Sequence, residues 1–340
     1  MPQRQRIDLA EVAAWPNLQG ALWAAASGKR ARPDVAAFLA DAPSRLVAVQ
    51  DALLRGVLPD GRQRAFAIHD PKPRLIHAAP FADRVAHHAL MGLMAPRLEL
   101  ALVPTSFACR PGRGVHACVQ HAQGLMLRQP QAWALHLDVW HCFPQIPHAP
   151  LLSLLARRVK GSALALVEHT VRAFETTPGS ARGLPIGALT SQHFANAYLG
   201  ELDRFALGQP ACLGHVRYMD DVVLWCANRA DGLALAAAMQ GFAQDTLGLR
   251  LKPPKLAPVR AGLLLCGMRL GPRGIRPGPR RQRAWAQRWH GLQAAWAAGE
   301  LTEAQAQQQA QMLGSLCLPA RPRAWQRSVM GAAIELDALR

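Results

Sequence analysis

Two adjacent carboxylates stand between apolar residues in the stretch Val216-Arg217-Tyr218-Met219-Asp220-Asp221-Val222-Val223-Leu224-Trp225. Two apolar runs joined by a short polar pair predict a β-hairpin over 215–226, with the pair at its tight turn. Like charges side by side repel each other and raise each other's pKa unless a cation lies between them. Because magnesium prefers carboxylate and phosphate oxygens, we expect Asp220 and Asp221 to bind a divalent metal ion.

A third carboxylate, Asp138, ends an apolar stretch over 132–138 that reads as a strand. If this strand and the hairpin end together, three carboxylates converge, which is the layout of a two-metal phosphoryl transfer. One metal ion would activate a 3′-hydroxyl, and the other would hold the triphosphate and the leaving group. We therefore expect a nucleotidyltransferase with Asp138, Asp220 and Asp221 as its catalytic acids and two Mg²⁺ ions, which Mn²⁺ could replace.

The charge balance indicates a polyanionic partner. The 340 residues include 39 Lys and Arg but only 22 Asp and Glu, a net charge of +17. Most of the cations are arginine, which forms bidentate hydrogen bonds with phosphate. RNA or DNA is the simplest partner, although a GC-rich genome would also enrich arginine and alanine.

Several other classes are excluded by composition. No apolar run reaches the roughly 18 residues of a membrane span, and no apolar signal core follows the polar N-terminus, so we expect a cytoplasmic protein. The seven cysteines have no C-x-x-C spacing and are odd in number, which favours neither a disulfide framework nor a zinc site.

Apolar periodicity predicts a mixture of helices and strands. The predicted strands are a pair around the prolines at 71 and 73, the stretch 132–138, the hairpin and a strand starting at 249–251. Tryptophans recur among the arginines near the C-terminus, which suits a surface along a nucleic-acid backbone or the core of a small helical bundle: Trp285, Trp289, Trp296 and Trp325. The predicted helices cover 9–28, 32–54, 83–96, 115–127, 149–158, 163–174, 190–206 and 233–247, with three more from residue 282 onward.

The hairpin stretch resembles the Tyr-x-Asp-Asp box of reverse transcriptases, and the likeness extends over about 64–270. Leu137-Asp138-Val139-Trp140-His141-Cys142-Phe143-Pro144 looks like the first catalytic box of that family. The resemblance implies that Val139 joins the three acids as a metal ligand and that Tyr218 and Met219 line the nucleotide site. It also implies that Phe143 is the steric gate, whose ring presses on a ribose 2′-hydroxyl and favours deoxynucleotides; a core phenylalanine is the alternative.

Two basic blocks resemble the fingers of prokaryotic reverse transcriptases. The first contains Arg74, which would reach the incoming triphosphate. The second, over 106–114, contains Arg110 and Arg113, which would contact phosphate or template. In a glycine-containing turn these two arginines could equally be solvated charges.

The most discriminating stretch is Gly183-Leu184-Pro185-Ile186-Gly187-Ala188-Leu189-Thr190-Ser191-Gln192. Most reverse transcriptases have Gln at the place of Ile186 and Pro at the place of Gln192. The form Ile-Gly-x-x-x-Ser-Gln resembles the enzymes of diversity-generating retroelements, which copy a template RNA into cDNA with errors at adenines. An aliphatic Ile186 cannot form the hydrogen bonds of a glutamine, which is a physical reason for looser control of base pairing.

Two later segments complete the resemblance. The stretch 247–255 looks like the next family box, and Lys255 could protonate the departing pyrophosphate or be a solvated lysine. Leu265-Cys266-Gly267-Met268-Arg269 lies where the family usually has Phe-Leu-Gly-Tyr. Because the aromatic residues are missing, primer handling is expected to differ from that of relatives.

The resemblance implies an α+β right-hand polymerase. Its palm is an antiparallel sheet backed by helices, at 138–270, with a fingers-like insert near 149–180. A helical extension at 1–63 and fingers at 64–137 precede it, and a helical thumb at 271–340 follows.

The function implied is RNA-directed DNA synthesis in a bacterial or phage-encoded diversity-generating retroelement. The expected partners are template RNA, primer and cDNA, deoxynucleoside triphosphates and a small basic accessory protein. The alternatives are a stand-alone defence-type reverse transcriptase and, in another class, a catalytically idle RNA-binding relative. An RNA-dependent RNA polymerase fits less well, because Phe143 stands at the gate position.

Overall fold

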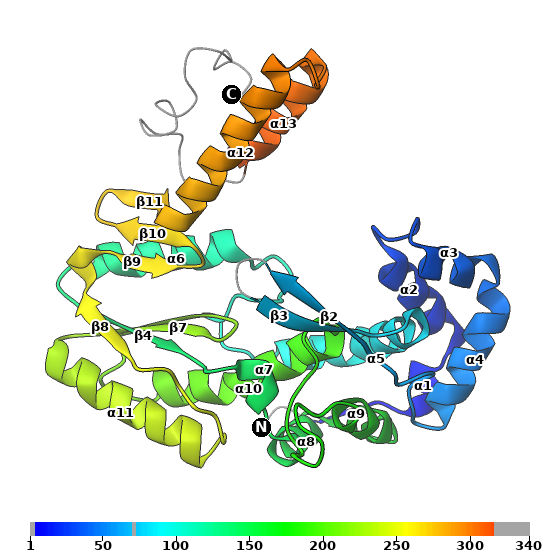
Figure 1. Ribbon diagram of the computed structural model, residues 1–340. Helices are drawn as coiled ribbons and strands as arrows, with labels where there is room; N and C mark the ends of the chain where they lie inside the picture. Colours follow the sequence, from blue (N-terminus) through cyan, green and yellow to red (C-terminus); the bar gives the residue numbers. More distant parts are fainter. Residues whose placement is uncertain (1–3, 70–72, 316–340) are drawn as a thin grey trace.

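A four-stranded antiparallel sheet forms the centre of the molecule (Figure 1). The computed structural model describes residues 4–69 and 73–315. The strand order is β6-β7-β4-β8. The predicted hairpin, the predicted strand ending at Asp138 and the α+β fold class are confirmed. The strands are β6 (Gly214–Tyr218), β7 (Asp221–Cys226), β4 (Trp133–Asp138) and β8 (Lys255–Pro258).

The two faces of this sheet are buried in different cores because side chains alternate along each strand. On one face Leu135 and Leu137 of β4 pack with Val222 and Leu224 of β7 in the largest core. Two helices back this face: α10 (Leu189–Leu207) and α11 (Arg229–Asp245).

The other face carries Val223 and Trp225, which pack in a second core. The layer over it consists of α6 (Val115–Arg128) and a three-stranded sheet, reached from β8 through a 3₁₀ turn (Val259–Ala261). Near the edge of this face the side chains of Asp138 and Asp221 remain 39% and 30% exposed. The covering strands are β9 (Leu263–Leu265), β10 (Met268–Gly271) and β11 (Gly274–Pro277).

The N-terminal helices pack around α5 (Phe81–Glu99). Two long helices were expected here, over 9–28 and 32–54, but each is divided. Pro16 and Pro43 lie in the first turns of α2 and α4, where proline, which lacks an N–H, starts a helix rather than continuing one. The four helices are α1 (Leu9–Val12), α2 (Trp15–Ala26), α3 (Pro33–Ala40) and α4 (Ala42–Leu54).

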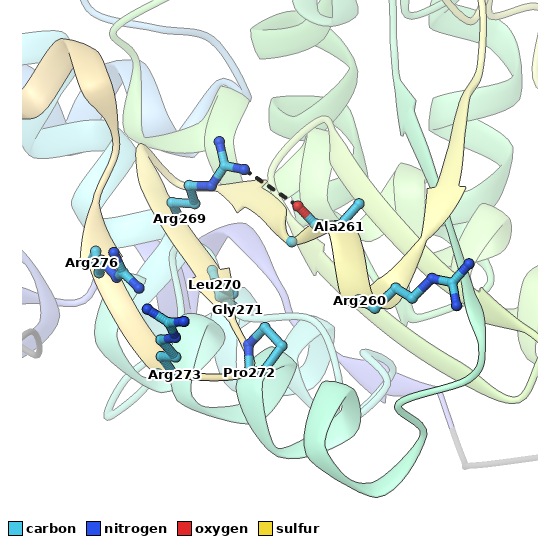
Figure 2. Close-up of a pocket in the computed structure, with 10 residues that line it drawn as sticks. Arg260, Ala261, Arg269, Leu270, Gly271, Pro272, Arg273 and Arg276 are labelled. Atoms are coloured by element: carbon cyan, nitrogen blue, oxygen red, sulfur yellow. Dashed lines mark hydrogen bonds between the residues drawn. The ribbon is translucent and has the colours of Figure 1, made fainter.

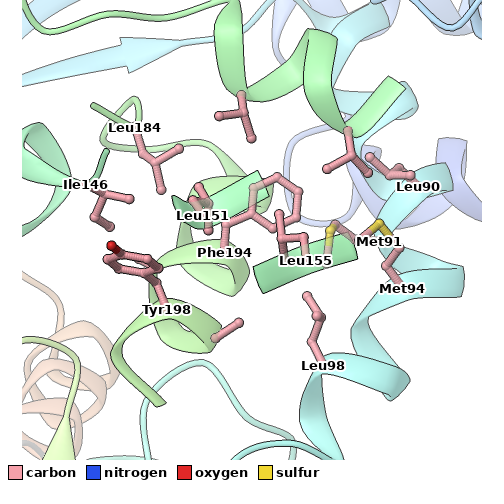
Figure 3. Packing of buried hydrophobic residues seen from close by; sticks show 14 of the residues in the cluster. Leu90, Met91, Met94, Leu98, Ile146, Leu151, Leu155, Leu184, Phe194 and Tyr198 are labelled. Atoms are coloured by element: carbon pink, nitrogen blue, oxygen red, sulfur yellow. The ribbon is translucent and has the colours of Figure 1, made fainter. Parts of the chain in front are cut away.

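A helical insert follows the first catalytic strand and joins the same core. Phe194 and Tyr198 of α10 pack with residues of α5 and α8, including Met94 and Leu151 (Figure 3). The N-terminal β1 (Gln5–Arg6) is bound to this insert as a parallel partner of β5. The elements of the insert are α7 (Cys142–Gln145), α8 (His148–Ala156), β5 (Val159–Lys160) and α9 (Ala163–Arg172).

The predicted strand pair before α5 is confirmed as a separate hairpin, β2 (Arg64–His69) and β3 (Pro73–Ala78). It is anchored to the segment before α10, where the backbone N–H of His77 donates to the carbonyl of Ile186 at 2.9 Å. The strand expected at 249–251 is wrong in position: Leu251 forms a single bridge to Val139, and β8 starts at Lys255. The intervening Pro253 and Pro254 cannot donate ladder hydrogen bonds.

Beyond the sheets, α12 (Pro279–Ala297) and α13 (Glu303–Ser315) form an antiparallel pair (Figure 1). Trp285 and Trp289, one helical turn apart, are buried and stacked 5.5 Å apart in its core. These two tryptophans therefore form the bundle core rather than a nucleic-acid surface. Trp296 is 39% exposed, and Trp325 and the third predicted helix lie outside the described residues. Among the described helices, none combines the length and the apolarity needed to cross a bilayer.

Candidate active site

Strand register brings the predicted acids together. Asp138, the last residue of β4, is the direct antiparallel partner of Asp221, the first residue of β7. Opposite residues in such a pair have Cβ atoms about 4.5–5.5 Å apart, and like charges there are destabilising. Asp220 lies in the two-residue turn between β6 and β7, and its carbonyl accepts from the N–H of Val139 at 3.2 Å. The three acids thus lie at one end of two neighbouring strands.

The turn is tight and positioned by the residue before Asp220. Met219 has a φ of 55°, in the left-handed region that only a minority of non-glycine residues adopt. Its carbonyl accepts from Nη1 of Arg217 at 3.0 Å. This backbone conformation directs Asp220 out of the hairpin beside the ends of β4 and β7.

The electrostatics of the three acids are unfavourable without a cation. Burial raises the pKa of Asp220, and the charges of Asp138 and Asp221 raise it further, while Lys252 lowers it. A carboxyl in this position keeps its charge only when positive charge lies close by. The group of acids is therefore suited to binding cations.

Lys252 and His136 form hydrogen bonds with two of these acids. Nζ of Lys252 lies 2.6 Å from Oδ2 of Asp138, and Nε2 of His136 hydrogen-bonds Oδ1 of Asp221. Oδ1 of Asp138 is buried and has no hydrogen-bond partner among the described residues. Within that part of the chain no three His, Cys, Asp or Glu side chains converge on one point. The buried orphan oxygen and the oxygen-only donor set fit a hard divalent cation.

A buried ion pair behind the sheet holds the hairpin in place. Arg217, fully buried, donates from Nε and Nη2 to Asp203 of α10 at 2.7 Å each. Its Nη1 donates to Oδ1 of Asn196 at 2.7 Å, and Asp203 also bonds His215 at 3.1 Å. Burial alone would raise the pKa of Asp203, but Arg217 and His215 outweigh it and lower the pKa to about 2. These positioning residues were not predicted from the sequence, although a lone arginine inside an apolar strand required a partner.

The segment with Ile186 and Gln192 lies between the β2–β3 hairpin and the catalytic turn. Gly187 has a φ of 112°, and a Cβ there would lie 3.0 Å from Cγ2 of Ile76, so glycine permits the close approach to β3. The thiol of Cys109 links Gln192 to the turn, with Sγ 3.4 Å from Oε1 of Gln192 and 3.7 Å from Sδ of Met219.

Phe143 lies in α7, five positions after Asp138, and is partly buried against the main core. Its carbonyl accepts from the N–H of Leu184 at 2.9 Å. This bond ties α7 to the start of the segment that carries Ile186. The backbone of Phe143 is therefore bonded to the start of that segment, while its side chain packs against the main core.

The predicted arginines differ in their surroundings. Arg74 is exposed on β3. Arg110 is largely buried: its Nε donates to Glu99 at 2.7 Å, and its Nη1 donates to the carbonyls of Val103 and Ser106. Arg113 is half-buried and donates to the carbonyl of Pro104, and its Cζ lies 5.8 Å from the centre of the Phe107 ring. Internal bonds therefore engage Arg110 more fully than Arg74 or Arg113.

The lysine nearest to the acids is Lys252 and not the predicted Lys255. Lys255 is exposed at the start of β8 and is the register partner of His136. The backbone N–H of Lys252 donates to the carbonyl of Asp138 at 2.8 Å, so both its main chain and its side chain contact that acid. The role of Lys255 as a proton donor stays a prediction.

Comparison with known proteins finds one matching family and two distantly similar proteins. The sequence model of the family described as "Reverse transcriptase (RNA-dependent DNA polymerase)" matches residues 69–315. An uncharacterized 91 kDa protein in the cob intron of Schizosaccharomyces pombe is 26% identical over 150 residues, which is 43% of this chain and 17% of that protein. Telomerase from Candida albicans, solved in complex with a fragment of telomeric RNA, is 10% identical with a TM-score of 0.47, over 67% of this chain and 50% of that one. The chain thus spans half or less of the length of these relatives.

Proposed function

Because the chain belongs to the reverse transcriptase family, we propose that it is an active RNA-directed DNA polymerase. The observation that carries this proposal is the register of Asp138 against Asp221, with Asp220 in the adjoining turn. Two like charges opposite each other destabilise a sheet, so the stability of the fold does not explain this pair. A phosphoryl-transfer site explains it, because such a site needs several carboxylates around its cations.

The residues that would hold the metal ions are Asp138, Asp220 and Asp221, together with the carbonyl of Val139. When bound, Mg²⁺ or Mn²⁺ would neutralise the developing charge on the nucleotide phosphates and lower the pKa of the primer hydroxyl. Oδ1 of Asp138 has no hydrogen-bond partner among the described residues and would be available as a ligand of such an ion. Lys252 and His136, which contact the same acids, have to yield part of their hydrogen bonding when the ions bind.

The protein's own residues then position the substrates. Exposed Arg74 on the β2–β3 hairpin would bind the incoming triphosphate. Phe143, five positions after the first acid, would exclude a ribose 2′-hydroxyl, and Tyr218 and Met219 would line the nucleotide site. Lys255 would supply the proton to the departing pyrophosphate. In this scheme the protein contributes orientation and electrostatics, with little covalent chemistry.

Primer extension tests this proposal. The purified chain would be given an RNA template, an annealed DNA primer, Mg²⁺ and either deoxynucleotides or ribonucleotides. We expect template-dependent DNA synthesis, a strong preference for deoxynucleotides that Phe143→Ala relaxes, and no synthesis by Asp221→Asn. Absence of synthesis by the wild type, with the accessory factors of its locus supplied, would favour an RNA-binding relative without catalysis.

We also propose that synthesis is error-prone opposite template adenines, in a diversity-generating retroelement. Support comes from Ile186, whose aliphatic side chain cannot form the hydrogen bonds of a glutamine, and from Gln192, which contacts the catalytic turn through Cys109. A small basic accessory protein would be a partner. Sequencing of the cDNA discriminates: errors concentrated at adenines support this assignment, whereas evenly low errors support a stand-alone defence-type enzyme.

A further inference from the structure

An arginine-lined pocket lies at the edge of the β9–β10–β11 sheet, away from the catalytic turn (Figure 2). It has a volume of about 310 Å³ and is lined by Arg260 of the 3₁₀ turn and by Arg269, Arg273 and Arg276 of β10, β11 and the turn between them. No acidic residue and no aromatic ring belongs to its lining among the described residues. The pocket was not expected from the sequence.

The arrangement of the arginines is electrostatically unfavourable by itself. Arg269 and Arg276 are direct cross-strand partners, and like charges directly opposite each other destabilise a sheet. Within the described parts of the chain, neither Arg260 nor Arg276 has an ion pair, and the one hydrogen bond of Arg269 goes to the carbonyl of Ala261 at 3.3 Å. An anion between Arg269 and Arg276 would remove the repulsion between them.

The backbone around the pocket is shaped for a close approach. Gly262, between the 3₁₀ turn and β9, has a φ of 86°, and a Cβ there would lie 2.9 Å from the carbonyl oxygen of Leu270. The inner face of the same strands is anchored, since Met268 and Leu270 are fully buried in the second core. The arginines therefore project from a fixed platform, which lowers the entropy cost of binding.

The chemistry of the lining identifies the ligand as a backbone phosphate. The only side-chain polar groups are guanidinium donors, which bind phosphate in bidentate fashion. The lining has no aromatic ring and no side chain that accepts hydrogen bonds, so its side chains favour the phosphate of a nucleotide over the base. RNA, which the proposed activity requires as template, presents such phosphates in series.

The pocket lies toward the end of β10 that is farther from the three acids. The turn at Cys266, which precedes β10, packs against the second core together with Tyr218, the residue that ends β6 just before the turn with Asp220. The pocket lies at the other end of β10, beside Gly271. At about 3.3 Å per residue, Arg269 lies about 10 Å and Gly271 about 16 Å along the strand from Cys266. A nucleic acid bound at the three acids would have to extend along β10 to reach the arginines.

We propose that this arginine pocket anchors a folded part of the template RNA away from the three acids through its phosphates, without reading sequence. The inference rests on the proposed function for its choice of RNA. Its function would be to retain the template during synthesis rather than to contribute to the chemistry at the acids.

Binding and extension measurements with matched variants test this. The variants are Arg260→Gln, Arg276→Gln and their combination, with Arg229→Gln at the exposed start of α11 as the control. Binding is followed in EDTA without nucleotides, for a short RNA–DNA primer–template and for the same duplex lengthened by an RNA stem at either end. Extension of the short duplex is measured in parallel.

For the double variant we expect binding of at least one lengthened RNA to weaken about 10-fold and its salt slope to fall by about 1–2. Binding and extension of the short duplex should stay unchanged, and the melting temperature should stay equal or rise, because a like-charge contact is removed. The Arg229→Gln control should behave as the wild type.

Unchanged binding of both lengthened RNAs would overturn the proposal, as would an equal loss on the short duplex, which would assign the pocket to the binding of the primer–template at the acids. Tight binding of inorganic phosphate or of an acidic protein, without any effect on RNA, would also overturn it. Failure of the proposed activity would be recognised separately, as absent extension by the wild type with RNA binding intact.

Discussion

Lys252 contacts Asp138 twice, through its Nζ at 2.6 Å from Oδ2 and through its backbone N–H at 2.8 Å from the carbonyl. The lysine follows the bridge between Leu251 and Val139, which aligns this segment with the end of β4. A positive charge is thereby held on one side of the proposed metal site. Any cation that binds Asp138 has to compete with it.

Replacing Lys252 should therefore strengthen the response to magnesium. Since a partly exposed ion pair contributes about 0.2–1 kcal/mol, Lys252→Met should lower the Mg²⁺ concentration for half-maximal extension by about 1.5–5-fold. The matched variant Lys255→Met should leave this concentration unchanged and lower the maximal rate by about 10²-fold, the usual contribution of a general acid. A magnesium requirement that is unchanged or higher in Lys252→Met would contradict the competition.

Asp220→Asn should lower the rate of DNA synthesis without lowering the stability of the fold. The raised pKa of Asp220 means that the folded state holds its proton more tightly than the unfolded state, so this residue lowers stability as pH rises above its ordinary value of 3.8. At neutral pH the variant should melt at an equal or higher temperature while its extension rate falls by at least about 10²-fold, since a metal site supplies several kcal/mol. A lower melting temperature would show that Asp220 stabilises the fold.

Asp203→Asn should be strongly destabilising. Removing one partner of a buried ion pair costs about 3–5 kcal/mol because the remaining charge is left uncompensated. Chemical denaturation would measure this, and Asp203→Asn combined with Arg217→Met should recover part of the loss. The pKa of Asp203, lowered from 3.8 to about 2, gives the pH dependence: its stabilisation is complete above pH 3.8 and is lost as pH falls toward 2. Equal stability of variant and wild type at pH 7 would contradict the role of the pair.

Ile186→Gln should lower the error frequency opposite template adenine. One added hydrogen bond contributes about 0.5–1.5 kcal/mol, which corresponds to about a 2–10-fold change in discrimination. Ile186→Leu is the matched control, because it keeps an apolar side chain beside Gly187. If the wild type, Ile186→Gln and Ile186→Leu gave cDNA with the same error spectrum, Ile186 would not determine fidelity.

Local patterns predicted the elements of the catalytic centre but not their supports. The hairpin and the strand ending at Asp138 could be predicted because each is a short apolar run bounded by carboxylates, a pattern that neighbouring residues alone define. The contact of Lys252 was missed because it depends on how the chain crosses the end of β4 before Pro253. The pairing of Arg217 with Asp203 joins a strand to a helix, and nothing local indicates the partner. The sequence was compatible with Trp285 and Trp289 on a surface or in a core. Their packing against α13, which joins residues distant in the sequence, places them in the core.

The central claim is that Asp138 and Asp221, opposite each other on β4 and β7, serve one metal-binding site. The measurement that tests it most directly is the single-turnover rate of adding one deoxynucleotide to an RNA-templated primer, in wild type, Asp138→Asn, Asp221→Asn and the double variant. Residues that act as a unit are non-additive, so each single variant should lose nearly as much rate as the double variant. Additive losses, or near wild-type rates in either single variant, would contradict the claim.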